Sequence, residues 1–397
     1  MRDVIILGST GSIGTQAIEV VQAHPDTFRI TGLSAGGGHI ERLAEQIGAI
    51  CPPRVAVPNE EAAAALKQAL GFRGIKAPSI VVGPLASCAL ARSGADVVLN
   101  AITGYAGLDP TLAVLQSGAK LALANKESLV VGGFLVTSAA KPGQIVPVDS
   151  EHSAIAQALR SGAPQEVRRL ILTASGGPFR GRTREKLQRV TVRQALAHPT
   201  WDMGRVVTIN SSTLVNKGME LIEAAVLFGV GWDDIQVVVH PQSVIHSMVE
   251  FRDGSTIAQC SPPDMRLPIA LGLSWPERIA DVVPPCDWTQ AARWTFEPVD
   301  NETFPAVELA RKVGRMGGTV PAVFNAANEV CVDAFCAKKL GFLGIVDTVA
   351  EIVNAYIARY PADGYPGALG VAVTLDQIHS ADAWGRGAAE DIIEGDS

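Results

Sequence analysis

Hydrophobic positions in the first 150 residues alternate between short β-branched runs and longer stretches with helical spacing. The short runs, each of a length typical of one strand, are residues 4–7, 28–33, 55–57, 80–82, 96–101, 121–124 and 145–148. Between them apolar residues recur every three or four positions, for example over 15–23 and 40–47. This alternation predicts an α/β domain, in which a Rossmann-like parallel sheet has helices on both faces. Such sheets bind ligands at the carboxyl ends of their strands.

The pattern changes after residue 150. Runs at 170–173, 236–239 and 247–251 predict strands, and 214–228 predicts a helix. Residues 275–300 contain Pro and Trp with little periodicity, which is typical of a linker. Helical spacing returns over 304–313, 321–339 and 345–359. We therefore expect an N-terminal α/β domain (1–149), a central α+β domain (150–274), a linker (275–300) and a small α-helical domain (301–397).

Composition narrows the class of protein. A hydrophobic share of 47% with 18% charged residues is that of a globular chain. The formal charge of −7 provides no general attraction to nucleic acid or to an anionic membrane, so neither is an expected partner. The apolar run 4–7 is too short for a signal peptide, and we expect a cytoplasmic protein. None of the six cysteines forms a C-x-x-C pair, which favours reduced thiols.

A glycine-rich loop follows the first predicted strand and opens the first predicted helix. Gly8, Gly11 and Gly14 permit a tight turn, and the amides of the helix N-terminus suit a pyrophosphate. A glycine turn without a ligand is the alternative interpretation. The second strand ends in 33–39, Leu-Ser-Ala-Gly-Gly-Gly-His, where an NAD site would place an acid. Its absence favours NADP, with His39 and Arg42 as the nearest groups for the 2′-phosphate.

Acidic side chains follow the last strand of the predicted sheet. If this segment is extended, Asp149 and Glu151 face the same way, and two converging carboxylates need a cation between them. Oxygen ligands of this kind suit Mg²⁺ or Mn²⁺. The alternative is that Asp149 or Ser150 caps the next helix. Glu220, in a second segment, offers a third carboxylate.

Donors that suit a phosphate monoester surround that third carboxylate. Asn216 shares a helix face with Glu220, and Ser211 and Lys217 add a hydroxyl and an ammonium group. An ordinary capped surface helix is the alternative. Three further segments have unusual composition: Ser-Gly-Gly at 175–177, a Trp- and Met-containing loop at 198–204 that resembles a lid, and Asn-Lys-Glu at 125–127. We interpret His240 and His246 as structural.

These segments together resemble the 1-deoxy-D-xylulose 5-phosphate reductoisomerase family over essentially the whole chain. The motifs that carry the resemblance are G-S-T-G-S-I-G, L-A-N-K-E-S, P-V-D-S-E-H, S-G-G-P-F, H-P-T-W-D-M-G, N-K-G-M-E, H-P-Q-S-V-I-H and P-D-M-R-L-P-I. The resemblance implies a homodimer whose central domain is both catalytic and dimerising. It also implies NADPH and a divalent cation, Mg²⁺ or Mn²⁺ with Co²⁺ as an alternative. The chain departs from the family at 37–39, where many members have a Lys-Asn pair.

The resemblance assigns roles to individual residues. The cofactor would be bound by Thr10, Gly11, Ser12, Ile13, Gly36, Gly38, His39, Asn125, Glu127 and Gly204. The metal would be bound by Asp149, Glu151 and Glu220. The substrate would contact Lys126, Ser150, Glu151, Ser175, His198, Ser211, Asn216, Lys217 and Glu220. Catalytic roles would fall to Lys126, Glu151 and His198, and Trp201 and Met203 would form a closing flap.

The implied reaction is a rearrangement and reduction of a small phosphorylated sugar-like substrate. Members convert 1-deoxy-D-xylulose 5-phosphate to 2-C-methyl-D-erythritol 4-phosphate in the non-mevalonate isoprenoid pathway. Two other classes share the glycine loop: a metal-independent NADP dehydrogenase of the homoserine or semialdehyde type, and a non-catalytic nucleotide sensor. Neither class needs the three carboxylates. Loss of activity on chelation would exclude the metal-independent dehydrogenase, and NADPH oxidation would exclude the non-catalytic sensor.

Overall fold

A computed structural model describes residues 1–201, 203–360 and 372–395. The chain forms two compact units. Unit 1 comprises Met1–Asn125, Ser138–Ser153 and Asp264–Pro284, and unit 2 comprises Lys126–Thr137, Ala154–Pro263 and the described residues from Pro285 onward. Most of the expected central domain and the described part of the C-terminal segment thus belong to one compact unit. The finer division at 149, 274 and 300 stays a prediction, and residues 361–371 and 396–397 of the expected helical domain lie outside the described residues.

Unit 1 is built on a seven-stranded parallel sheet in the order β4-β3-β2-β1-β5-β6-β7. Its strands are β1 (Arg2–Leu7), β2 (Phe28–Ser34), β3 (Arg54–Val57), β4 (Ser79–Val82), β5 (Val97–Asn100), β6 (Lys120–Leu123) and β7 (Ile145–Pro147). All seven predicted strands are therefore confirmed. The order reverses direction at β1, so the carboxyl ends of β1 and β5 form the crevice where such sheets bind ligands.

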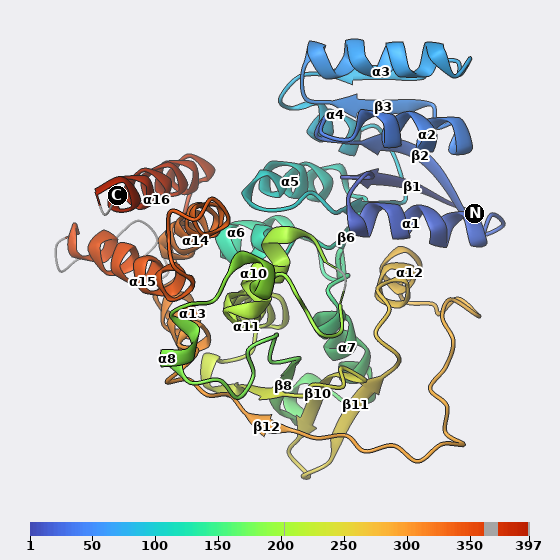
Figure 1. Cartoon of the computed structure of the whole chain (residues 1–397). Helices are drawn as coiled ribbons and strands as arrows, with labels where there is room; N and C mark the ends of the chain where they lie inside the picture. The colour runs from blue at the N-terminus through green and yellow to red at the C-terminus, as the bar shows by residue number, and fades with distance from the viewer. Residues whose placement is uncertain (202, 361–371, 396–397) are drawn as a thin grey trace. The chain divides into compact units, whose positions relative to one another are not determined.

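Helices cover the sheet of unit 1 because its strands are apolar on both faces. Val4 and Ile6 of β1 belong to a core shared with α1 (Ser12–Ala23), α2 (Ile40–Ile50), α3 (Glu60–Phe72) and α12 (Arg266–Ser274). The alternate residues Ile5 and Leu7 are also fully buried, as expected for a sheet with helices on both faces. Figure 1 shows these helices beside the strands. The remaining helices of this unit are α4 (Ala86–Ala91), the 3₁₀ turn η1 (Tyr105–Gly107) and α5 (Leu108–Ser117).

Two helices carry the chain between the units. They are α6 (Lys126–Ala139), whose first residues belong to unit 2, and α7 (Ser150–Ala158), whose first residues belong to unit 1. In α6 the backbone is non-helical at Gly133. The helix α12, which lies in the range expected for the central domain, packs on α1 and on β5, β6 and β7 of unit 1. Gly272 permits that approach, since a Cβ there would lie 2.7 Å from the Val148 side chain.

Unit 2 contains a mixed five-stranded sheet in the order β11-β10-β8-β9-β12, in which only the β8–β9 pair is parallel. Its strands are β8 (Val167–Ala174), β9 (Ile235–Val239), β10 (Ile245–Phe251), β11 (Thr256–Cys260) and β12 (Glu297–Pro298). The three predicted strands are confirmed, whereas β11 and β12 were missed. β11 has three exposed residues followed by two of intermediate exposure, so it shows no alternation, and β12 is only two residues long.

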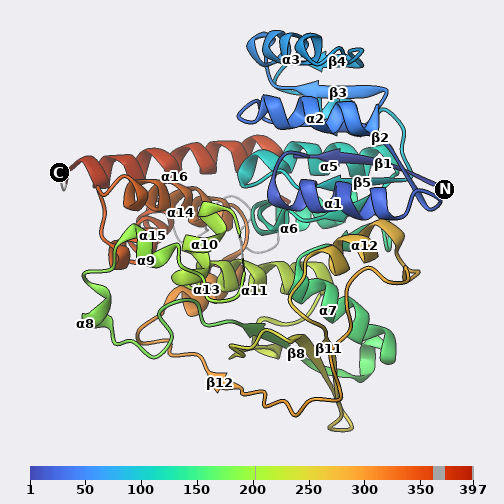
Figure 2. The same cartoon turned by 45° about the vertical axis from the view of Figure 1, so that its right-hand side comes forward.

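The helices of unit 2 are α8 (Arg184–Leu187), α9 (Val192–Ala195), α10 (Arg205–Ser212), α11 (Val215–Phe228), α13 (Ala306–Met316), α14 (Val320–Cys336), α15 (Phe342–Ala358) and α16 (Leu375–Gly395), with 3₁₀ turns η2 (Leu159–Ser161), η3 (Pro164–Glu166) and η4 (Trp232–Asp234). Among them α10 and α13 pack on both α11 and α14, and α15 and α16 pack on α14 (Figure 2). Gly218 lets α11 approach α13, since a Cβ there would lie 2.7 Å from that of Ala310. In the described residues, no helix is both long and apolar enough to span a bilayer.

The cysteines fit the interpretation made from their spacing. All six are free thiols in the structure. Burial raises the pKa of the Cys331 thiol to about 12, so this side chain stays protonated and unreactive at neutral pH.

Candidate functional site

The glycine loop of unit 1 is a rigid connection between β1 and α1. Gly8 has φ +82, and a Cβ there would lie 2.6 Å from the carbonyl oxygen of Ala101. Its amide donates to Ser34 O at 3.0 Å, which ties the loop to the end of β2. Because α1 begins at Ser12 without a side-chain cap, its first amides have no intrahelical acceptor and point at any bound anion. Thr10, Gly11, Ser12 and Ile13 thus form the turn that leads into the N-terminus of α1.

A buried pair braces this loop from α2. Ser9 Oγ donates to Gln46 Oε1 at 2.9 Å, and Gln46 Nε2 donates to Ser9 O at 2.8 Å. The sequence analysis missed this pair. The signal that could have found it is a polar residue on the buried face of a helix, between Leu43 and Ile47.

The glycine-rich loop after β2 is exposed. Gly36 and Gly38 are exposed, with space for a Cβ, and Gly37 has φ +88. His39 is the N-cap of α2 and is exposed. Arg42, in the first turn of α2, donates from Nη1 to Thr10 O at 3.1 Å. The structure therefore brings this arginine to the rim of the glycine loop.

Asn125 closes the carboxyl end of β6 in unit 1. Its side-chain Nδ2 donates to Gly104 O at 2.9 Å. Gly107 leaves no room for a Cβ beside the Asn125 amide, and Gly107 O accepts from Asn100 Nδ2 at 2.9 Å. This network fixes the Asn125 side chain at the binding edge of the sheet.

The carboxylates after β7 lie in a helical turn, and the extended geometry expected from the sequence is wrong. α7 begins at Ser150, and Ser153 N donates to Asp149 O at 2.9 Å, because the backbone turns at once after the short strand. Asp149 Oδ1 accepts from Glu151 N at 3.3 Å and lies 3.2 Å from His152 Nδ1. Ser150 Oγ donates to Glu151 Oε2 at 2.5 Å. The capping interpretation is correct for Asp149, and both carboxylates still share one turn.

His152 is a second residue that sequence analysis did not single out. Its ring is fully buried beside Asp149. A histidine bonded to a carboxylate in this way orients it, as outer partners of metal ligands do.

A buried ionic cluster joins α6 and α11 within unit 2. Lys126 Nζ donates to Glu220 Oε1 at 2.8 Å and to Asn216 Oδ1 at 3.0 Å. Asn216 Nδ2 donates to the same Glu220 oxygen at 2.5 Å, and Lys217 Nζ bonds to Oε2. The side chains of Lys126, Lys217 and Glu220 are only 10%, 5% and 2% exposed. Charges buried to this degree are costly unless they are paired, and here both lysines pair with Glu220.

A second polar cluster lies at the carboxyl end of β8. Gly176 and Gly177 follow Ser175 with φ +82 and +64. A Cβ on Gly177 would lie 2.9 Å from Ser211 O, so the turn packs directly on the end of α10. Ser175 Oγ is 3.0 Å from His198 Nε2. The structure thus brings Ser175, His198 and the Ser211 backbone together, and their role in binding an anion stays a prediction.

The Trp- and Met-containing loop begins at this histidine. The Trp201 ring lies 6.1 Å from the ring of His246, and Met203 O accepts from Thr208 Oγ1 at 3.2 Å. Gly204 is the exposed N-cap of α10. Asp202, within the same motif, lies outside the described residues. Glu127 is buried in the first turn of α6.

The structural interpretation of His240 and His246 is confirmed. His240 Nε2 accepts from the amides of Val244 and Ile245 at 3.2 and 3.1 Å, so Nδ1 carries the proton and donates to Thr295 O at 2.9 Å. His246 Nε2 lies 3.1 Å from Ser261 O, and burial lowers the pKa of this imidazole.

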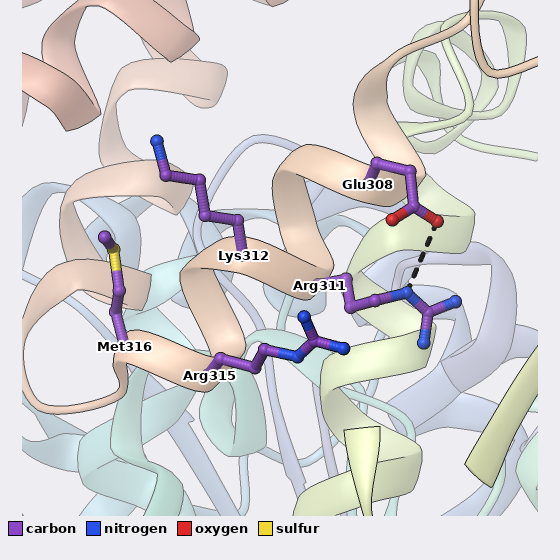
Figure 3. A pocket seen from close by; sticks show the side chains of 5 residues that line it. All are labelled: Glu308, Arg311, Lys312, Arg315 and Met316. Carbon is purple, nitrogen blue, oxygen red and sulfur yellow. Dashed lines mark hydrogen bonds and ion pairs between the residues drawn. The ribbon is translucent and has the colours of Figure 1, made fainter. Parts of the chain in front are cut away.

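A basic pocket of about 340 Å³ on α13 is separate from these clusters (Figure 3). It is lined by Glu308, Arg311, Lys312, Arg315 and Met316. The Arg311 guanidinium bonds to Glu308 and to the carbonyls of Trp232 and Ile235, and Arg315 pairs with Asp233. The two arginines therefore anchor α13 to the turn before β9. None of the residues predicted to form the site lines this pocket.

Comparison with known proteins covers almost the whole chain. Three models match: 1-deoxy-D-xylulose 5-phosphate reductoisomerase at residues 4–133, its C-terminal domain at 145–228, and the DXP reductoisomerase C-terminal domain at 260–388. The reductoisomerase of Cutibacterium acnes is 61% identical over 99% of this chain and 98% of its own length. That of Kitasatospora griseola is 58% identical over 99% and 100%.

Solved structures agree with the sequence matches. A crystal structure of DOX-P reductoisomerase in complex with NADPH, fosmidomycin and magnesium has a TM-score of 0.90 at 36% identity, covering 99% of this chain and 98% of that one. The Zymomonas mobilis enzyme in complex with NADPH has a TM-score of 0.88 at 38% identity, with 99% of both chains covered. The chain belongs to the 1-deoxy-D-xylulose 5-phosphate reductoisomerase family.

Proposed function

We propose that this protein converts 1-deoxy-D-xylulose 5-phosphate to 2-C-methyl-D-erythritol 4-phosphate, with NADPH and a divalent metal ion. The observation that carries the proposal is the full-length likeness to enzymes of that name, one of them solved with NADPH and magnesium. The geometry supports it, because the chain has a glycine loop for a dinucleotide, oxygen ligands for a hard cation and a donor-lined turn for a phosphate.

The glycine loop fits a dinucleotide phosphate. Thr10, Gly11, Ser12 and Ile13 would hold the pyrophosphate at the start of α1, whose first amides are available. The ribose would lie against Gly36, Gly38 and His39, and Asn125, Glu127 and Gly204 would contact the rest of the cofactor. When bound, NADPH supplies the hydride for the reduction.

We further propose that Arg42 holds the 2′-phosphate in place of the Lys-Asn pair that this chain lacks. A guanidinium has five N–H groups, and the bond to Thr10 O uses one of them. Arg42→Gln is expected to weaken NADPH binding about 10- to 100-fold, since a hydrogen bond to a charged group contributes roughly 1.5–3 kcal/mol. NADH binding should change less than about 2-fold, because NADH has no such phosphate.

Fluorescence titration of the free protein with each nucleotide measures both constants. Arg29→Gln is the matched control, since Arg29 is a surface arginine of the same unit bonded to Asp3. Equal weakening of NADPH and NADH by Arg42→Gln would assign Arg42 to loop structure only.

Asp149, Glu151 and Glu220 would bind the metal, with Mg²⁺, Mn²⁺ or Co²⁺ as the cation. The donor set fits, because three carboxylates provide the hard oxygen ligands that these ions prefer. Asp149 and Glu151 share one turn of unit 1, and Glu220 is the acid of the ionic cluster in unit 2. When bound, the ion supplies Lewis-acid stabilisation of the oxyanion that develops during rearrangement.

The chain's own residues position the substrate. Ser175, His198, Ser211, Asn216 and Lys217 would bind the phosphate end. Lys126, Ser150 and Glu151 would lie near the reacting end, where Lys126 Nζ donates to a substrate hydroxyl and the Glu151 carboxylate accepts a proton. Trp201 and Met203 would close over the substrate and exclude water.

We also propose that the protein works as a cytoplasmic homodimer that interacts with neither nucleic acid nor membrane. The family likeness supports the dimer, and the net charge of −7 disfavours polyanionic partners. Light scattering coupled to size exclusion measures the assembly directly.

The function is tested by following NADPH absorbance with and without 1-deoxy-D-xylulose 5-phosphate. Oxidation is expected only with the substrate, should stop when the metal is removed by EDTA, and should return with excess Mn²⁺. Oxidation that persists after exhaustive chelation would instead support the metal-independent dehydrogenase. If no NADPH is oxidised with any added metal, the non-catalytic nucleotide sensor becomes the better interpretation.

A further inference from the structure

His198 has a defined tautomer. Its Nδ1 faces the backbone amides of Thr200 and Trp201 at 3.2 and 2.9 Å. An amide N–H can only donate, so Nδ1 accepts, and the ring is neutral with its proton on Nε2. Burial of the ring lowers the pKa of His198, in agreement with the neutral form.

That tautomer decides the direction of the bond to Ser175. Because Nε2 carries the proton, it donates to Ser175 Oγ at 3.0 Å. The amide of Gly177 donates to the same oxygen at 3.3 Å. With donors on both lone pairs of the hydroxyl oxygen, its own hydrogen is left to donate to a third group. An anion oxygen in front of the Ser-Gly-Gly turn is the acceptor this arrangement suits.

We propose that His198 acts at the phosphate end through Ser175 and not by direct contact, as a positioning residue that couples the serine of the anion site to the loop carrying Trp201. Through Nε2–H it orients the Ser175 hydroxyl as a donor to the substrate phosphate. Through Nδ1 it holds the backbone turn at Thr200 and Trp201. The proposal rests on the proposed function for the identity of the anion, but the hydrogen-bond pattern of the ring stands without it.

Two substitutions separate the bond to Ser175 from the bonds to the loop amides. Asparagine places its side-chain oxygen near the position of Nδ1, so His198→Asn keeps the acceptor for the loop amides and loses the bond to Ser175. Glutamine reaches the position of Nε2, so His198→Gln keeps a donor for Ser175 and loses the acceptor for the loop. His24→Gln, a partly exposed histidine at the end of α1 in unit 1, is the control.

The kinetic experiment combines each variant with Ser175→Ala. In the wild type and in His198→Gln, Ser175→Ala should raise KM for the deoxyxylulose phosphate about 10-fold or more, the value of one charge-assisted bond, with kcat changed less than about 3-fold. In His198→Asn it should add less than about 2-fold, because the hydroxyl has already lost its orientation. An equal effect of Ser175→Ala in all three backgrounds would overturn the coupling.

The conformation of the loop that carries Trp201 is measured in the absence of substrate by fluorine NMR. The protein is labelled with 5-fluorotryptophan, and the Trp201 resonance is assigned from Trp201→Phe. His198→Asn should keep the wild-type shift, and His198→Gln should move or broaden it. An unchanged Trp201 resonance in His198→Gln would refute the part of the proposal that concerns Nδ1. Because this measurement needs no turnover, it stays decisive if the chain fails to act on the deoxyxylulose phosphate, which would contradict only the proposed function.

Discussion

Glu220→Gln is expected to lower turnover by about 10³-fold at saturating Mg²⁺ while the chain still folds, since it removes both a proposed metal ligand and the charge on which two lysines converge. Glu220 Oε1 accepts from Lys126 and Asn216, and Oε2 accepts from Lys217. Glutamine replaces one oxygen by an NH₂ group, which would face a donor. The steady-state kcat at rising Mg²⁺ measures the loss.

The same variant should be less stable. Removing one partner of a buried ion pair typically costs about 3–5 kcal/mol, because the other charge is left uncompensated. A lower Tm with a cooperative transition is therefore expected, and NADPH binding, which we assign mainly to the glycine loop of unit 1, should persist. Glu220→Asp is the control, since it keeps the charge but shortens the reach. Turnover near the wild-type value in Glu220→Gln with excess Mg²⁺ would remove Glu220 from the metal site.

Lys126→Met is expected to lower kcat by about 10²- to 10³-fold with little change in KM, as for loss of a general acid–base group. Lys217→Met should instead raise KM, because we assign Lys217 to the phosphate end of the substrate. The two ammonium groups are a matched pair, since both bind the carboxylate of Glu220. In either variant the other lysine still pairs with Glu220, so the two should have similar Tm values.

Initial rates over a range of substrate concentrations separate the two effects. The assignment is supported if Lys126→Met mainly lowers kcat and Lys217→Met mainly raises KM. If both variants lose kcat equally, the cluster acts as one unit and the division of roles between the lysines is wrong.

The parallel sheet was predictable because most of its strands are buried on both faces, although the edge strand β4 is only partly buried. Such strands are short continuous apolar runs between helical segments, and β1 to β7 all have this signature. The strand β11 does not have this signature, because its first three residues are exposed. It forms by pairing with β10, a contact that its own sequence does not indicate. The helix α12 packs on unit 1 more than a hundred residues after β7, a long-range contact that no local pattern encodes.

The chemistry of the site was more predictable than its geometry. Motif composition predicted the carboxylates, donors and glycines of the candidate site, and helix periodicity correctly put Asn216 and Glu220 on one face. The turn that carries Asp149 is helical where the sequence suggested extended backbone, because β7 ends at Pro147 and α7 starts three residues later. The bond from Lys126 to Glu220 joins residues 94 positions apart, and only the fold of unit 2 reveals it.

The direction of individual hydrogen bonds could not be predicted from the sequence. Nothing in the sequence indicates which nitrogen of His198 carries the proton; the two loop amides that face Nδ1 decide it. The hydrogen bond from Arg42 to Thr10 O likewise depends on the direction in which α2 begins after the glycines at 36–38.

Calorimetric titration with Mn²⁺ tests the central claim most directly, because it asks whether carboxylates from two separate segments hold the same ion. The wild type is expected to bind a single Mn²⁺ per chain at the catalytic site, and Asp149→Asn, Glu151→Gln and Glu220→Gln should each weaken that binding by about 10-fold or more. Wild-type affinity in Glu220→Gln, alongside loss in Asp149→Asn, would contradict a shared metal site and with it the proposed chemistry.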